Sequence, residues 1–231
     1  MSGNQKRSRR RGTSSSALRS APAGGRFGQA SLLLLSAALM AACSRKEENL
    51  AAMPFFDDFN RAEFGPHWSG DPVWRIQDGE VTVAGAQNRP LWLRASLPDD
   101  SVIELTARSE SPDGDIKFEI YGNGRDHASG YILIFGGWKN SISCIARLDE
   151  HGADRQELAR PGMVEPGRSY RMKVVRRDKV LKWYVDGKLL LDYYDSEPLR
   201  GPGHDRFAFN DWAARLFFDD LRVRAATPQD P

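Results

Sequence analysis

The chain has 231 residues, of which 40% are hydrophobic and 28% charged, so it is long and apolar enough to bury the core of one globular domain. Its net charge of +2 is misleading, because seven of the 33 basic residues and none of the 31 acidic ones precede residue 43. The rest of the chain keeps 26 basic and 31 acidic side chains, a net charge of −5, which argues against nucleic acid as a partner.

The N-terminal segment has the pattern of a secretory leader. Basic side chains precede an apolar run at residues 30–42 (ASLLLLSAALMAA), which is shorter than the helix of about twenty residues needed to span a bilayer. Residues 40–43 (MAAC) resemble the lipobox of bacterial lipoproteins, although Met40 stands where leucine is usual. The resemblance implies cleavage before Cys43, lipid on its thiol and a place in a bacterial envelope, at the outer membrane. The alternative is an ordinary signal peptide followed by an unrelated cysteine.

Lipidation of Cys43 would leave Cys144 as the one other cysteine, so no intrachain disulfide is expected. Cys144 alternates with Ile142, Ala146 and Leu148, which predicts an inward-facing, buried thiol. We expect four segments: residues 1–42 as the signal peptide, 43–53 as the lipidated cysteine and tether, 54–225 as the folded domain, and 226–231 as a disordered tail.

From residue 54 onward, short apolar–polar alternations are separated by Gly, Pro, Asn and Asp, which is typical of an all-β fold of two antiparallel sheets. Ile103, Leu105 and Ala107 share one face of their run, while Glu104 and Thr106 share the other. Residues 116–120 alternate in the same way, and the turn sequence at residues 112–114 (PDG) predicts a hairpin between the two runs. Further strands are expected at residues 131–135, 142–148, 170–177, 180–185, 188–194 and 216–224.

Three stretches resemble the concanavalin A-like lectin/glucanase superfamily. They are residues 56–60 (FDDFN) followed by 74–79 (WRIQDG), the laminin-G-like residues 183–187 (WYVDG), and residues 218–223 (FDDLRV). The layout also resembles 3-keto-disaccharide hydrolase-type domains. The resemblance implies a concanavalin A-like jelly roll over residues 54–225, and it does not by itself assign a function.

The Glu-x-Asp-x-x-Glu strand of the superfamily's glucanases is absent. Asp115 and Glu119 would lie about 13 Å apart on one strand, beyond the ~5–9.5 Å that separates glycosidase carboxylates. In the expected hairpin, Glu104 would lie diagonal to Glu119 at about 7–8 Å, a separation that suits an inverting pair. The alternative for these residues is a solvated polar sheet face.

Candidate ligand-binding residues lie mostly in turns. Trp138 and Trp212 occupy turns, where their rings would either stack on sugars or plug the ends of the sandwich. Asn140 and Arg89 are candidates for hydrogen bonds to hydroxyl groups, and Tyr121 belongs with Glu104 and Glu119 to a polar sheet face that, in the concanavalin A-like superfamily, can line the ligand-binding side. Two further tryptophans, at 74 and 183, lie in alternating runs and are expected in the core. Residues 88–89, residues 125–127 and the histidine at 204 could meet at one rim.

Asp57 and Asp219 lie near the two ends of the expected domain and alternate with apolar residues, which predicts inward-facing carboxylates. Buried carboxylates need hydrogen bonds or a cation. A structural calcium ion is one explanation, because hard oxygen ligands suit it, and capping of backbone amides is the other.

These features favour a monomeric, envelope-anchored lipoprotein whose jelly roll binds carbohydrate or another envelope ligand without catalysis. One alternative is a glycoside hydrolase or 3-keto-glycoside-cleaving enzyme, for which Glu104 and Glu119 are the candidate carboxylates. The other is a structural envelope protein that docks a protein partner.

Overall fold

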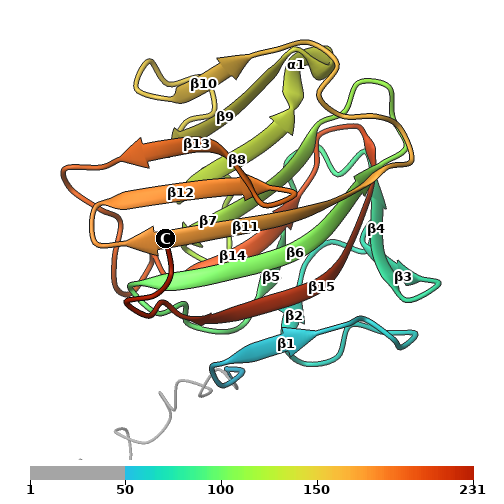
Figure 1. The fold of residues 1–231 in the computed structure, drawn as a ribbon. Helices are drawn as coiled ribbons and strands as arrows, with labels where there is room; N and C mark the ends of the chain where they lie inside the picture. The colour runs from blue at the N-terminus through green and yellow to red at the C-terminus, as the bar shows by residue number, and fades with distance from the viewer. Residues whose placement is uncertain (1–49) are drawn as a thin grey trace, which may run out of the picture. The chain divides into compact units, whose positions relative to one another are not determined.

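The computed structural model describes residues 50–231, and its strands form two antiparallel sheets that pack face to face (Figure 1). The sheet that we call sheet A has the order β13-β12-β11-β6-β15-β4-β3, with β1 also paired to β15. Its strands are β1 (Phe55–Asp57), β3 (Arg75–Gln77), β4 (Glu80–Ala84), β6 (Ser101–Ser109), β11 (Ser169–Arg177), β12 (Val180–Val185), β13 (Lys188–Tyr194) and β15 (Arg215–Ala225).

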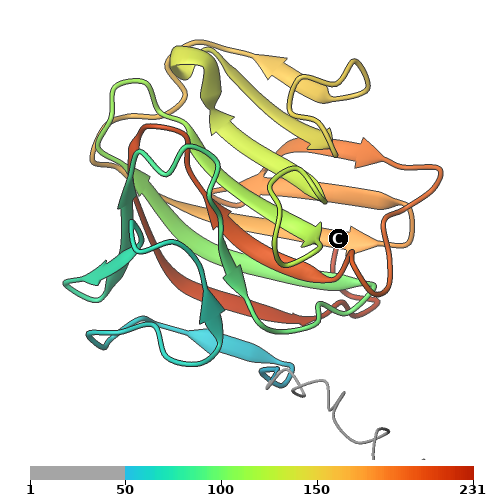
Figure 2. The same cartoon turned by 180° about the vertical axis from the view of Figure 1, so that it is seen from behind.

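Sheet B, which faces the viewer in Figure 2, has the order β10-β9-β8-β7-β14-β5-β2. Its strands are β2 (Trp68–Ser69), β5 (Leu91–Leu93), β7 (Ile116–Gly122), β8 (Tyr131–Gly136), β9 (Ile142–Arg147), β10 (Gln156–Ala159) and β14 (Arg206–Asn210). One short helical turn, α1 (Gly137–Asn140), joins β8 to β9. The predicted all-β sandwich is confirmed. Within residues 50–231, no helix is long and apolar enough to cross a membrane.

Alternation along the strands builds the core between the sheets. Ile103, Leu105 and Ala107 of β6 are buried there, while Glu104 and Thr106 lie on the outer face of sheet A. The predicted hairpin of β11 and β12 is present, and the two expected core tryptophans are buried, at positions 74 and 183. Hydrophobic burial of this kind is the main source of stability for a domain with no disulfide within its described residues.

Aromatic rings from both sheets meet at the centre of this core. Phe209 of β14 stacks on Phe218 of β15, with ring centroids 4.4 Å apart. Trp68 stacks on the same Phe209 at 5.4 Å, so the contact continues toward the end of the sandwich formed by β2. These rings fix how the sheets lie against each other, because stacked aromatic pairs add a directional preference to the burial of apolar area.

The predicted hairpin between residues 102–108 and 116–120 is wrong. Strand β6 lies between β11 and β15 in sheet A, whereas β7 lies between β8 and β14 in sheet B. The intervening residues cross from one sheet to the other, and Ser109 Oγ donates to the carbonyl of Gly114 at 2.7 Å within this crossover. Glu104 and Glu119 therefore lie on the outer faces of opposite sheets, so the predicted diagonal carboxylate pair does not exist.

The expected inward face of β9 lies instead on the outer side of sheet B. Cys144 and Ala146 are buried there with Ile132 and Ile134 of β8 in a small second apolar cluster. Burial of Cys144 is thus confirmed, although on the other face, while Leu148 lies beyond the strand and is exposed. Burial raises the pKa of the Cys144 thiol to about 12.

The C-terminal segment is ordered, contrary to the predicted tail at residues 226–231. Ala226 donates its backbone N–H to the carbonyl of Asp100, and the buried Asp230 accepts two hydrogen bonds from Arg224, at 2.6 and 2.8 Å. Thr227 bonds the same carboxylate through its backbone N–H and its hydroxyl. The predicted signal peptide and Cys43 lie outside the described residues.

Candidate functional site

The outer face of sheet B is covered by loops and is not the solvated surface that alternation suggested. Lys117 and Glu119 point outward from β7, yet only 2% and 0% of their surfaces are exposed. Residues of the loops 85–90, 123–130 and 148–155 contact them from above. Buried ionic groups are costly unless they are paired, so their partners define this region.

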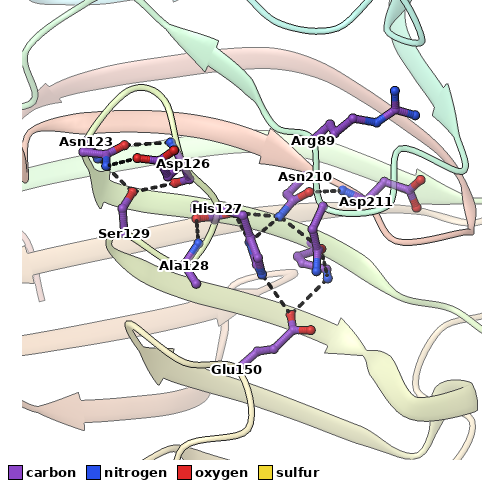
Figure 3. Close-up of polar contacts among 12 residues, drawn as sticks. Arg89, Asn123, Asp126, His127, Ala128, Ser129, Glu150, Asn210 and Asp211 are labelled. Atoms are coloured by element: carbon purple, nitrogen blue, oxygen red, sulfur yellow. Dashed lines mark hydrogen bonds and ion pairs between the residues drawn. The ribbon is translucent and has the colours of Figure 1, made fainter. Parts of the chain in front are cut away.

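Glu119 is fully engaged by hydrogen bonds, and its partners His127, Ala128 and Asn210 are labelled in Figure 3. Its Oε1 accepts from Asn210 Nδ2 at 2.6 Å and lies 2.7 Å from His127 Nδ1, and its Oε2 accepts from the backbone N–H of Ala128 at 3.1 Å. Glu119 therefore ties β14 and the loop of residues 123–130 to β7. A carboxylate held in this way is a positioning group for the loop and is sealed from solvent.

Lys117 is the second centre of the same region. Its Nζ donates to Asn88 Oδ1 at 2.8 Å and to Glu150 Oε2 at 3.1 Å, and that Glu150 oxygen lies 3.7 Å from His127 Nε2. We call the connected set the outer-face network; it comprises Asn88, Lys117, Glu119, His127, Glu150 and Asn210. Buried, paired charges beside a cavity are a frequent property of functional sites.

A groove of about 660 Å³ opens beside the outer-face network. Its lining includes Trp138 from α1, Trp212 from the loop after β14, and three charged side chains at Asp115, Lys117 and Glu150. Trp212 is 53% exposed, although it is a large apolar residue. The groove therefore combines two aromatic rings with several hydrogen-bonding groups, which is the usual composition of a small-molecule site.

Two side chains contact the Trp138 ring. The His151 ring contacts it edge-on, with centroids 5.7 Å apart, and the Arg155 guanidinium lies 4.7 Å from the centroid of its ring. Its backbone is left-handed, with φ of 49°, as is that of the next residue, Lys139, at 60°. Left-handed backbone costs about 1 kcal/mol or more for a residue other than glycine and clusters at ligand sites.

The same strained conformation occurs at two further lining residues, Asn88 with φ of 58° and Asp115 with φ of 59°. Asp211 helps to hold Asn88 in place. Its backbone carbonyl accepts from Asn88 N, and its Oδ2 accepts from Ala86 N, both at 2.8 Å. Burial raises the pKa of Asp211 above its usual range. This carboxylate thereby fastens the loop of residues 85–90 to the loop that carries Trp212.

Asp115 is the most perturbed carboxylate of the groove. Burial raises its pKa to about 6, and the charges of Asp211 and Glu150 add to that effect, while Lys117 opposes it. A carboxyl group with a pKa near neutrality is able to donate or accept a proton under physiological conditions. Asp115 is therefore the residue of this groove best suited to acid–base chemistry.

A second depression, of about 530 Å³, lies on the same face and shares Asn88 with the groove. It brings together Arg89 and residues 125–127, as the sequence suggested for one rim. His204 does not line it; its Nδ1 lies 2.9 Å from the Ser129 carbonyl. Trp92 also lines this depression, and the edge of its ring lies so close to Gly122 of β7 that a Cβ atom there would meet it at 2.4 Å.

The structure separates the predicted ligand-binding residues. Trp138 and Trp212 line the groove, and Arg89 lines the second depression, where it pairs with Asp71 at 2.7 Å. Tyr121 and Asn140 line neither the groove nor the second depression. The Tyr121 ring lies in the core, where its hydroxyl lies 2.7 Å from Ser101 Oγ.

Asn140 has a structural role. Its side-chain amide donates to the carbonyl of Val164 at 2.7 Å and accepts from the Val164 N–H at 3.0 Å. Both polar ends of the amide are therefore used by the chain itself, and Asn140 holds the loop after β10 against α1. It is not free to bind a ligand.

The alternative in which the two proposed calcium ligands cap backbone amides fits the structure: Asp57 Oδ1 accepts from the backbone N–H of Phe59 at 3.0 Å, and Asp219 Oδ1 accepts from that of Asp220 at 2.7 Å. Asp57 is buried, but its carboxylate pairs with Arg61 and accepts from Trp68 Nε1 at 2.9 Å. Asp219 lies with Phe217 on the outer face of sheet A, contrary to the inward direction predicted, and the register shift between Asp219 and Arg222 turns only Leu221 into the core. Among residues 50–231, no group of three His, Cys, Asp or Glu side chains is arranged to hold a metal ion.

No protein family model matches the chain. An extracellular exo-α-L-arabinofuranosidase of Streptomyces chartreusis is 25% identical over 142 residues, which cover 62% of this chain. The match covers only 17% of that enzyme's length. This similarity extends over a part of a much longer protein.

Several solved structures have the same fold. The carbohydrate-binding module CBM66 from Bacillus subtilis superposes with a TM-score of 0.57 at 18% identity, over 69% of this chain and 96% of the module. A Bacillus licheniformis β-glucanase gives a TM-score of 0.57 at 12% identity, over 76% of this chain and the whole of the enzyme. A Bacillus subtilis protein of unknown function with a galectin-like fold gives 0.55 at 12%, over 75% and 96%. These likenesses show the jelly-roll fold.

Proposed function

We propose that the chain is a carbohydrate-binding protein and that its ligand lies in the groove between Trp138 and Trp212. The observation that carries this proposal is the exposed Trp212 ring, which shares a groove with Trp138 and with hydrogen-bonding side chains. The C–H faces of sugar rings stack on such aromatic rings, and hydroxyl groups need donors and acceptors beside them. The groove supplies both.

The polar lining suits an uncharged sugar. Lys117 and Lys139 provide positive charge, and Asp113, Asp115 and Glu150 provide negative charge, so neither sign dominates. Asp115 makes no hydrogen bond to the described side chains through its carboxylate, which leaves its oxygens able to accept from ligand hydroxyls. Two of the solved relatives by fold, a carbohydrate-binding module and a β-glucanase, support a sugar ligand.

The anchor is a separate part of the proposal. We infer from the lipobox-like residues 40–43 that Cys43 carries lipid and holds the domain at a bacterial envelope membrane. Replacing Cys43 by alanine should move the protein from the detergent phase to the aqueous phase on phase separation. Unchanged partitioning of Cys43→Ala would contradict the anchor and leave the sugar site unaffected.

Calorimetry with a panel of glycans tests the sugar site. Trp138→Ala and Trp212→Ala should each weaken binding by about five- to tenfold, the loss expected for one stacking contact of ~1–1.5 kcal/mol. The matched control is Tyr194→Ala, because Tyr194 is an exposed aromatic residue of β13 in sheet A. If the panel gives no binding, or if the three variants bind alike, the proposal is refuted.

Hydrolysis of a glycoside is the second candidate, and Asp115 is the observation that favours it. Its raised pKa of about 6 is the property required of a general acid. Asp115→Asn should then abolish release of reducing sugar while glycan binding persists. A binding protein without catalysis should release no sugar even before this substitution.

A further inference from the structure

The groove and the second depression adjoin at Asn88, which lines both of them and is partly exposed. Its Oδ1 accepts from Lys117 Nζ at 2.8 Å and from Asn210 Nδ2 at 3.4 Å. Its Nδ2 makes no hydrogen bond to the residues that the structure describes, and it is not one of their buried, unbonded atoms. The amide therefore keeps an accessible hydrogen-bond donor where the two depressions meet.

Charged side chains with unused hydrogen-bonding atoms line the second depression. Arg89 bonds the Ala86 carbonyl through Nε and Asp71 through Nη1, which leaves its Nη2 without a partner among residues 50–231. In Figure 3 its side chain extends away from the outer-face network. In the same part of the chain, the Arg125 guanidinium makes no hydrogen bond, and Asp126 uses only Oδ2 of its carboxylate. Guanidinium donors beside a carboxylate acceptor can bond adjacent hydroxyl groups of a sugar ring.

The two depressions differ in how they can hold a sugar. Trp138 and Trp212 line the groove, and the Trp212 ring is 53% exposed. In the second depression the tryptophan is Trp92, which is only 4% exposed and presents almost no surface for stacking. Stacking tolerates different sugars, because each ring has a C–H face, whereas hydrogen bonds depend on where the hydroxyl groups lie. The groove therefore suits affinity, and the second depression suits selection between glycans.

We propose that one glycan chain occupies both depressions, so that the ligand is an oligosaccharide of at least three units. This inference rests on the proposed carbohydrate function. Two units stack in the groove on Trp138 and Trp212, the next accepts a hydrogen bond from Asn88 Nδ2, and the units after it lie in the second depression. Because the depressions share Asn88, consecutive units of one chain can fill them. The second depression then selects the chain by the positions of its hydroxyl groups.

The experiment is calorimetry on the full-length protein with ladders of linear arabinan, β-1,3-glucan and chitin oligosaccharides, from disaccharide to hexasaccharide. In the ladder that binds, we expect the affinity to rise by about tenfold or more between the disaccharide and the tetrasaccharide, because one hydrogen bond to a charged group is worth about that factor. An affinity that changes by less than about threefold over the whole ladder would overturn the inference and leave the carbohydrate function standing. If none of the three ladders binds, both are refuted.

Variants locate the added affinity. Asn88→Asp keeps the oxygen that Lys117 bonds and removes the amide donor, and Arg89→Ala removes a donor from the second depression. Each should reduce the gain from disaccharide to tetrasaccharide to less than about threefold and leave the disaccharide affinity unchanged. Arg171→Ala is the matched control, because Arg171 is an exposed arginine on the outer face of sheet A, and it should keep the whole gain. Thermal unfolding identifies any variant that fails to fold. If folded Asn88→Asp and Arg89→Ala proteins both keep the whole gain, the second depression is not part of the site and the inference is wrong.

Discussion

Replacing Glu119 by glutamine is the sharpest test of the buried outer face of sheet B. The carboxylate is 0% exposed, and its two oxygens receive Asn210 Nδ2 at 2.6 Å, His127 Nδ1 at 2.7 Å and Ala128 N at 3.1 Å. A glutamine of the same shape turns one oxygen into an N–H₂ donor that faces another donor. At least one hydrogen bond to a charged group is lost, worth ~1.5–3 kcal/mol. We therefore expect the free energy of unfolding to fall by about 2 kcal/mol.

Chemical denaturation and thermal unfolding measure this loss, which corresponds to about 4–8 °C in Tm for a domain of this size. Glu104→Gln is the matched control. Glu104 is half-buried on the outer face of sheet A with no side-chain hydrogen bond in the described structure, so its substitution should change stability by less than ~0.5 kcal/mol. Equal stabilities of the two variants would refute the placement of Glu119 beneath the loops.

Two further outcomes follow from perturbed ionisations. Asp115 has a folded pKa of about 6 against an ordinary 3.8, so its ionisation opposes folding above that range. Asp115→Asn should accordingly raise the free energy of unfolding at neutral pH by on the order of 2 kcal/mol and change it little below pH 3.8. A lower free energy of unfolding for this variant at neutral pH would contradict the prediction. Cys144 is buried with a pKa raised to about 12, so thiol reagents should label it only after unfolding. Rapid native-state labelling would refute the register of β9.

The residues that face the core could be predicted, because apolar and polar residues alternate along a strand that has one buried face. Ile103, Leu105 and Ala107 lie where the pattern placed them. The sheet to which each strand belongs could not be predicted in this way. A turn sequence such as residues 112–114 can reverse the chain within one sheet or between two sheets. The apolar faces of β6 and β7 are buried in both cases, here because they pack against each other across the core.

The two tryptophans of the groove could be predicted from the sequence, whereas the buried charged residues beside them could not. Trp138 and Trp212 were identifiable because aromatic residues in turns need a covering or a ligand. Lys117 was not, since a charged residue in an alternating strand predicts solvent, and its covering partners, Asn88 and Glu150, lie some thirty residues away in each direction. The signal was present only as two charged residues, Lys117 and Glu119, on one face of an otherwise apolar strand.

Asn140 shows the opposite error. An amide two residues from a tryptophan in a turn is a reasonable ligand donor, but Val164 uses both of its polar atoms. The loop that carries Val164 is placed by tertiary contacts that no local pattern encodes. Tyr121 fails for a related reason, because a positive φ of 56° in β7 turns its ring into the core.

The positions of β14 and β15 affect how the chain reaches this structure. Strand β15 lies between β6 and β4 in sheet A, and β14 lies between β7 and β5 in sheet B. The last two strands of the sequence therefore take interior positions in the two sheets. Until these strands emerge from the ribosome, β4 and β5 have no neighbour on that side and neither sheet can close. Folding that depends on such distant partners is slow, because strands far apart in the sequence must find each other. Sheet B can therefore reach its final strand order only after residue 210 has been made, and sheet A only after residue 225.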